Sequence, residues 1–197
     1  VKKGLTRPEI AVLLAYSKME LYKRILESSL PDEPYFLSDL KRYFPKLMQD
    51  EFEDAIEKHR LKREIIATVM TNSIVNRAGI TFYFDIAEDT GAAARDVAAA
   101  YAIARDAFSL RTIWNDIEGL SPEVPLSTQV EMHVAANRFL EQATVWLLRN
   151  HTQPLDIDAI SESILPAIAE IEKNQGKLHS DTMRREAEKM VASLKEQ

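Results

Sequence analysis

The sequence predicts an all-α protein, an irregular multi-helix bundle of about eight or nine helices. Glycine is scarce, with 5 among 197 residues, and proline numbers 8, which favours long helices over strands joined by tight turns. Hydrophobic residues make up 46% of the chain and recur at the three- and four-residue spacing of a helix face. Charged residues make up 28%, which is typical of a globular chain that folds around a core.

The first helix is expected to begin at Thr6. Thr6 and Glu9 have the spacing of a capping box, in which each side chain satisfies a backbone N–H of the other residue. Pro8 is tolerated in the first turn of a helix. Apolar residues lie on two sides of this helix up to about residue 28, so we expect burial on more than one side. They are Ile10, Leu14, Leu21 and Ile25 on one side, and Val12, Met19 and Leu26 on the other.

The segment 59–79, HRLKREIIATVMTNSIVNRAG, predicts a helix that Gly79 ends. Projected at about 100° per residue, Asn72 and Asn76 fall in the middle of one apolar face, with Thr68 beside them. A second apolar stripe runs along the opposite side, so we expect this helix to be buried and its two carboxamides to face the interior. The apolar residues are Leu61, Ile65 and Val69 on the first face, and Ile66, Met70 and Ile74 on the second.

Three roles are open for the polar residues of this helix. They can contact a ligand, line a docking surface that another part of the protein covers, or hydrogen-bond the backbone of neighbouring helices. We favour the third role, because a buried amide without a partner costs about 1–3 kcal/mol. The residues to which we assign this structural role are Thr68, Asn72, Asn76 and Arg77.

The segment 81–90 is ambiguous between helix and strand. Its aromatic residues favour a strand, but a single strand among helices has no partner. Thr81 can cap a helix that Gly91 closes, so we favour a helix.

An alanine-rich helix is predicted over residues 93–108, and Ser109 is expected to cap the helix that follows it. Gly119 and the loop after it form the best internal boundary. We therefore divide the chain into a helical domain at 1–120 and C-terminal helices at 121–197 that pack on it, with a single domain over 1–197 as the alternative.

The segment 127–151 has the clearest periodicity, an apolar seam of alternating four- and three-residue steps that includes Trp146. Core packing is the expected role of that tryptophan. An isoleucine-rich helix follows from residue 157, with Pro166 as a possible kink, and a last amphipathic helix is expected over 183–194. The seam consists of Met132, Ala136, Phe139, Ala143 and Trp146.

Motifs for catalysis or cofactor binding are missing from the sequence. The five glycines are too widely spaced for a dinucleotide or phosphate-binding loop. The chain has no cysteine, and its four histidines lie far apart, which speaks against a metal site. No nucleophile elbow is present. We therefore assign no catalytic, no cofactor-binding and no metal-binding residue.

Charge and hydropathy exclude two classes of partner. Lys and Arg total 25 against 31 Asp and Glu, and the resulting net charge of −6 does not attract nucleic acid. No apolar run approaches the ~18 residues that a membrane span needs. The absence of cysteine is compatible with the cytoplasm, where we expect the protein to reside.

Four stretches together resemble the C-terminal region of the large NAD-specific glutamate dehydrogenases of bacteria. They are GLTRPEIAVLLAYSK at 4–18, HRLKREIIATVMTNSIVNRAG at 59–79, TFYFDIAEDTGA at 81–92 and WLLR at 146–149. The resemblance in order and spacing runs from Gly4 to about Arg149. The chain opens on Val1, and we interpret it as a piece of a longer protein.

The resemblance implies a parent enzyme that converts L-glutamate and NAD to 2-oxoglutarate and ammonium, and that assembles as a homo-oligomer. The catalytic lysine and aspartate of that family and its NAD fingerprint lie upstream, so no residue here is assigned to them. We expect an accessory domain that braces the upstream catalytic core or the subunit contacts and is inactive alone. The alternative is an independent helical interaction or regulatory module without a catalytic role.

Overall fold

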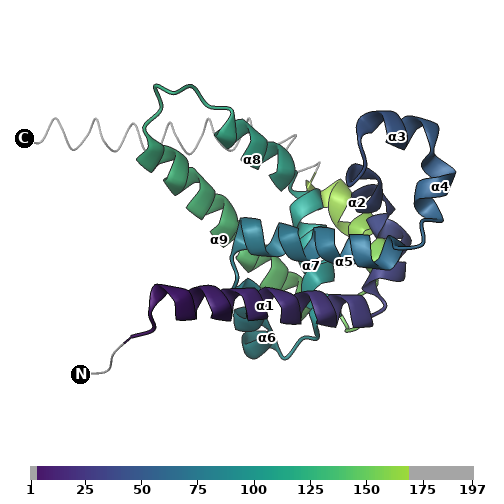
Figure 1. The fold of residues 1–197 in the computed structure, drawn as a ribbon, viewed down its shortest axis with the longest axis horizontal. Coiled ribbons are helices and arrows are strands. Elements are labelled where there is room, and N and C mark those ends of the chain that lie inside the picture. The colour runs from purple at the N-terminus through teal and green to yellow at the C-terminus, as the bar shows by residue number, and fades with distance from the viewer. Residues whose placement is uncertain (1–3, 169–197) are drawn as a thin grey trace, which may run out of the picture. The chain divides into compact units, whose positions relative to one another are not determined.

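The computed structural model describes residues 4–168, and within them the secondary structure is helical with no strand, which confirms the all-α class. A π-helical turn, η3 (Ile74–Ala78), continues α5, and two 3-10 turns, η1 (Leu30–Asp32) and η2 (Pro34–Phe36), follow α1. The bounded α-helices are α1 (Arg7–Glu27), α2 (Leu37–Arg42), α3 (Lys46–Glu51), α4 (Glu53–Glu57), α5 (Lys62–Ser73), α6 (Phe82–Thr90), α7 (Ala94–Ala107), α8 (Leu110–Glu118) and α9 (Leu126–Asn150) (Figure 1).

The chain divides into two compact units, residues 1–158 and residues 159–197. The loop at 119–125 lies inside the first unit, where α9 packs along α7 and α8. The division of the chain at residue 120 stays a prediction. Residues 157–168 are helical. The expected final helix over 183–194 lies outside the described residues.

Helix α7 forms the centre of the first unit. Twelve of its 14 residues are buried, and most of them are alanines. Alanine has the highest helix propensity, and its small side chain lets neighbouring helices approach closely on every side. Helices α1, α6, α8 and α9 all pack on α7, while α1 also runs side by side with α5 (Figure 1).

The capping box of α1 is confirmed. The Thr6 backbone N–H donates to a Glu9 carboxylate oxygen at 2.7 Å, and the Thr6 hydroxyl lies 2.6 Å from the same oxygen. These hydrogen bonds lower the pKa of Glu9. The expected burial of α1 is wrong over most of its length, because only Leu21 and Ile25 are buried. The neighbouring helices cover the C-terminal half of α1 and leave the N-terminal half open.

Local signals at helix ends are largely confirmed. Gly79 ends the π-helical turn with φ at +103°, and Gly91 ends α6 in the left-handed region with φ at +71°. Both conformations favour glycine because a Cβ atom is disfavoured there. The segment 82–90 is helical, as favoured, but Thr81 makes no side-chain capping hydrogen bond, so its predicted cap is wrong. Ser109 precedes α8, but its backbone is left-handed and its side chain makes no capping hydrogen bond, so the predicted cap is wrong.

The predicted seam of α9 is wrong. Met132, Phe139 and Trp146 are exposed, and Trp146 is 54% accessible, so it is not a core residue. The buried face lies one residue further along, which is a rotation of about 100° around the helix. Helix α9 contacts α7 more extensively than it contacts α8 or α6. The residues of the buried face are Leu140, Thr144, Leu147 and Leu148.

Candidate functional site

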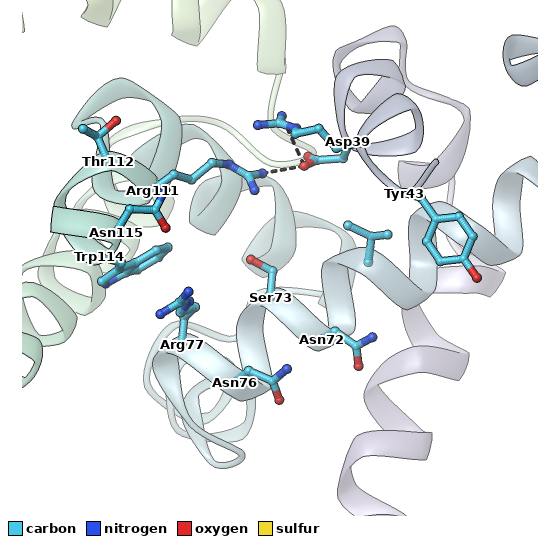
Figure 2. Close-up of a pocket in the computed structure, with 12 residues that line it drawn as sticks. Asp39, Tyr43, Asn72, Ser73, Asn76, Arg77, Arg111, Thr112, Trp114 and Asn115 are labelled. Carbon is cyan, nitrogen blue, oxygen red and sulfur yellow. Dashed lines mark hydrogen bonds and ion pairs between the residues drawn. The ribbon is translucent and has the colours of Figure 1, made fainter. Parts of the chain in front are cut away.

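A cleft of about 800 Å³ opens between the end of α2, the face of α5 and η3, and α8 (Figure 2). Three of the four polar positions singled out in the sequence, Asn72, Asn76 and Arg77, line it. The fourth, Thr68, lies outside the cleft and donates its hydroxyl to the Glu64 carbonyl of its own helix at 2.7 Å. The other lining residues are Asp39, Arg42, Tyr43, Val69, Ser73, Arg111, Thr112, Trp114 and Asn115.

The face that carries the two asparagines is open, so its expected burial is wrong. Asn76 is exposed and Asn72 is half-buried. Among the described residues, neither carboxamide makes a hydrogen bond. The opposite stripe, with Ile66, Met70 and Ile74, is the buried one. Sequence periodicity identified both apolar stripes, but the first is buried only at Ile65, whereas Leu61 is exposed and Val69 lines the cleft.

A buried ion network lies behind the cleft and holds α2, α7 and α8 together. The Arg105 side chain is completely buried and donates to Asp39 at 3.0 Å and to both carboxylate oxygens of Asp106 at 2.7 Å. Arg111 also binds Asp39, and its Nε donates to Asp106 at 3.2 Å. The Tyr35 hydroxyl donates to Asp106 at 3.1 Å.

Sequence reasoning missed this network, although it left a signal. Arg105 and Asp106 are adjacent charged residues near the end of an alanine-rich helix, after an uninterrupted run of uncharged residues at 97–104. A charge on such a helix requires a partner when it is buried. The partner Asp39 lies 66 residues away in the chain, so only the fold brings the two together.

The pKa shifts in the network follow from burial and pairing. Burial by itself raises the pKa of Asp106, but hydrogen bonds and charge from Arg105 and Arg111 outweigh it and lower that pKa below its usual value. Burial raises the pKa of Tyr35, and the nearby Asp106 carboxylate raises it further. The phenol therefore stays protonated and acts as a hydrogen-bond donor.

Arg77 connects η3 to α8 at the edge of the cleft. Its guanidinium forms an ion pair with Glu118. The guanidinium carbon lies 5.2 Å from the centre of the Trp114 ring, and Figure 2 shows the two side chains next to each other. A cation over an aromatic face at this distance is a favourable contact. Trp114 itself is buried, and its Nε1 has no hydrogen-bond partner among the described residues.

The cleft can bind an anion through the charged side chains that line it. Its charged groups are mainly arginines, which stay protonated at physiological pH. Within residues 4–168, no group of three or more His, Asp or Glu side chains is placed to hold a metal ion. No helix in the same range is long and apolar enough to cross a membrane.

A second feature is the apolar N-terminal half of α1. Six large apolar side chains within ten residues are exposed, with accessible fractions between 41% and 65%. A helix that is apolar all around is normally buried. The six residues are Ile10, Val12, Leu13, Leu14, Tyr16 and Met19.

The chain matches the protein family described as "Glutamate dehydrogenase, C-terminal" over residues 2–197. It is 37% identical to the NAD-specific glutamate dehydrogenase of Halomonas elongata over 175 residues, which is 89% of this chain and 11% of that protein. It is 42% identical to the Pseudomonas aeruginosa NAD-specific glutamate dehydrogenase over 154 residues, or 78% of this chain and 10% of that protein. The Mycobacterium tuberculosis protein of the same name is 37% identical over 156 residues, or 79% of this chain and 10% of that protein. The chain thus spans about a tenth of the length of these relatives.

Proposed function

The chain belongs to the family of glutamate dehydrogenase C-terminal domains, and on that premise we propose that it is the accessory C-terminal domain of a large NAD-specific glutamate dehydrogenase. The parent polypeptide oxidises L-glutamate with NAD to 2-oxoglutarate and ammonium in the cytoplasm. The NAD site and the catalytic residues lie upstream of this domain. The domain braces the catalytic core, or the contacts between subunits of a homo-oligomer.

The exposed apolar half of α1 carries this proposal. Proteins that act alone rarely leave several large apolar side chains together in water, and such a surface marks a contact with another protein part. The relatives devote about nine-tenths of their length to other segments. The upstream part of the same polypeptide is therefore the occupant that we assign to the α1 surface, which we define as Ile10, Val12, Leu13, Leu14, Tyr16 and Met19.

An independent interaction module is the less favoured alternative. Such a module would bind its partner in a groove between helices. The apolar residues of the α1 surface all lie on a single helix and form no groove. The cleft beside α8 is lined mainly by polar and charged residues, so it does not provide an apolar groove for a partner helix.

The proposed docking through α1 is tested by introducing a charged side chain into the α1 surface of the full-length parent polypeptide. Leu13→Asp puts a carboxylate into the proposed contact, where burial of an unpaired charge is unfavourable. We expect reduced glutamate-dependent NAD reduction and an altered oligomeric mass by light scattering. The same substitution in the 197-residue chain alone is expected to leave its thermal unfolding within a few degrees of the unmodified chain, because Leu13 is exposed there.

Leu47→Asp is the matched control, because Leu47 is also an exposed leucine but lies on α3. It is expected to change neither activity nor mass. Full activity and unchanged mass of the Leu13→Asp polypeptide would contradict docking through α1. An equal loss with Leu47→Asp would remove the special role of α1.

A further inference from the structure

We propose that the cleft between α2, the α5–η3 segment and α8 binds an organic carboxylate group, with Arg77 as its principal partner. The site is distinct from the α1 surface and does not depend on the proposed docking. The site is inferred from the arginine N–H groups that have no hydrogen-bond partner among the described residues, in contrast to those that already donate to the protein.

One side of the Arg77 guanidinium has N–H donors that are available to a ligand. Its Nη1 is bound to Glu118, whereas its Nε and Nη2 have no hydrogen-bond partner among the described residues. Nε and Nη2 form the side of the guanidinium that binds both oxygens of a carboxylate in parallel. The cation–π contact with Trp114 and the ion pair with Glu118 hold Arg77 and leave this side of the guanidinium available.

Two further arginines line the cleft with a free N–H group. Arg111 uses Nε and Nη2 in the ion network, and Arg42 uses Nε and Nη2 to bind Ser38 and Asp39. The Nη1 group of each has no hydrogen-bond partner among the described residues. Both arginines therefore retain donors for a ligand after they have bound the protein.

The charges around the cleft leave an excess of cations. Four arginines, at positions 42, 77, 105 and 111, face three carboxylates, at positions 39, 106 and 118, among the residues that the ion pairs connect. Burial lowers the pKa of Arg42, the Asp39 carboxylate opposes this lowering, and the neighbouring charges of Arg111 and Arg105 add to it. An anion in the cleft offsets this repulsion. The local excess stands out in a chain with a net charge of −6.

The size and rim of the cleft favour an organic acid over an inorganic ion. A volume of about 800 Å³ lies within the range of small-molecule sites, about 300–1,000 Å³. Asn72, Asn76 and Asn115 add neutral carboxamides to the lining. Each carboxamide both donates and accepts, so the rim can bind a second polar group of the ligand.

The carboxylate has two possible sources, and the experiment separates them. It belongs either to a free organic acid or to an Asp or Glu side chain of the upstream polypeptide. Succinate is titrated into the 197-residue chain by calorimetry at constant ionic strength, and in parallel by the fluorescence of Trp114 in a Trp146→Phe background. We expect saturable binding and a fluorescence change, because Arg77 lies on the Trp114 ring.

Arg77→Gln is expected to weaken succinate binding about tenfold or more, which is typical for loss of a charged hydrogen-bond pair. Arg149→Gln is the matched control, because Arg149 also pairs with a carboxylate, Asp89, but lies outside the cleft. It should leave the affinity unchanged. Asn76→Ala removes an exposed rim carboxamide without touching the core, and we expect it to weaken binding about threefold.

Three results would overturn the proposal: no saturable succinate binding below about 20 mM, tighter binding of inorganic phosphate than of succinate, or equal weakening by Arg149→Gln. The same succinate titration on the full-length parent polypeptide then distinguishes a free organic acid from an upstream Asp or Glu side chain. Retained succinate binding there supports a free organic acid, and loss of binding there supports a cleft filled by an upstream carboxylate.

Discussion

Helix α7 and the N-terminal half of α1 are both apolar, yet they have opposite environments. Half of the residues of helix α7 are alanine and nearly all of its residues are buried, whereas α1 carries large aliphatic and aromatic side chains that remain exposed. The small residues of α7 let four helices pack around it. The contrast teaches that apolar content by itself does not locate the core, because burial depends on which neighbours the fold supplies.

The arginines show the same contrast. Arg105 is fully buried, and Asp39 and Asp106 neutralise it. Arg77 is partly exposed and pairs with Glu118 through one nitrogen only. The first arginine stabilises the junction of helices, and the second keeps donors for a partner. Three predictions test the difference between the buried interior around α7 and the exposed surfaces of α1 and the cleft.

The largest effect is expected from Asp39→Ala. This change leaves the Arg105 charge in the interior without one of its two carboxylate partners, and breaking a buried ion pair costs about 3–5 kcal/mol. The free energy of unfolding, measured by urea denaturation of the 197-residue chain, should fall by that amount. The control Asp89→Ala removes the partner of exposed Arg149 and should cost about 0–1 kcal/mol. Similar losses of unfolding free energy in both variants would contradict a stabilising role of the buried ion network.

A smaller effect compares two leucines of the same helix. Leu21→Ala removes a buried side chain of α1 and should lower the free energy of unfolding by about 2–5 kcal/mol. Leu13→Ala, in the exposed half, should stay within about 0.5 kcal/mol of the unmodified chain. Both are measured by the same denaturation experiment. A large loss with Leu13→Ala would mean that the N-terminal half of α1 packs within the chain.

The smallest effect is a pH dependence. The folded-state pKa of Asp106 is lower than its unfolded value, since pairing with Arg105 and Arg111 outweighs burial. The stabilisation is therefore fully present above the unfolded pKa, near the ordinary aspartate value of 3.8, and is lost as pH falls through the lower folded pKa. Thermal unfolding between about pH 7 and pH 3 should show this acid-side loss. Asp106→Asn should reduce this loss of stability at acid pH. An unchanged loss in that variant would contradict the assignment of the pH dependence to Asp106.

Local features of the fold were predictable from the sequence. The capping box of Thr6 and Glu9 and the helix ends at Gly79 and Gly91 depend on residues only a few positions apart. The family resemblance carried by the 59–79 segment also proved correct over most of the chain. Ser109 shows the limit of local rules, because it occupies the expected N-cap position with a left-handed backbone and no side-chain cap.

The sequence by itself determined the all-α class, the approximate position of the helices and the absence of a dinucleotide fingerprint. Periodicity assigns residues to the faces of a helix but does not say which face meets a neighbour. Only the tertiary structure decided that Asn72 and Asn76 line an open cleft, that Trp146 is exposed, and that Arg105 reaches Asp39 across 66 residues. The physical reason is that burial and ion pairing depend on contacts between distant helices, whereas helix formation depends mainly on neighbours along the chain.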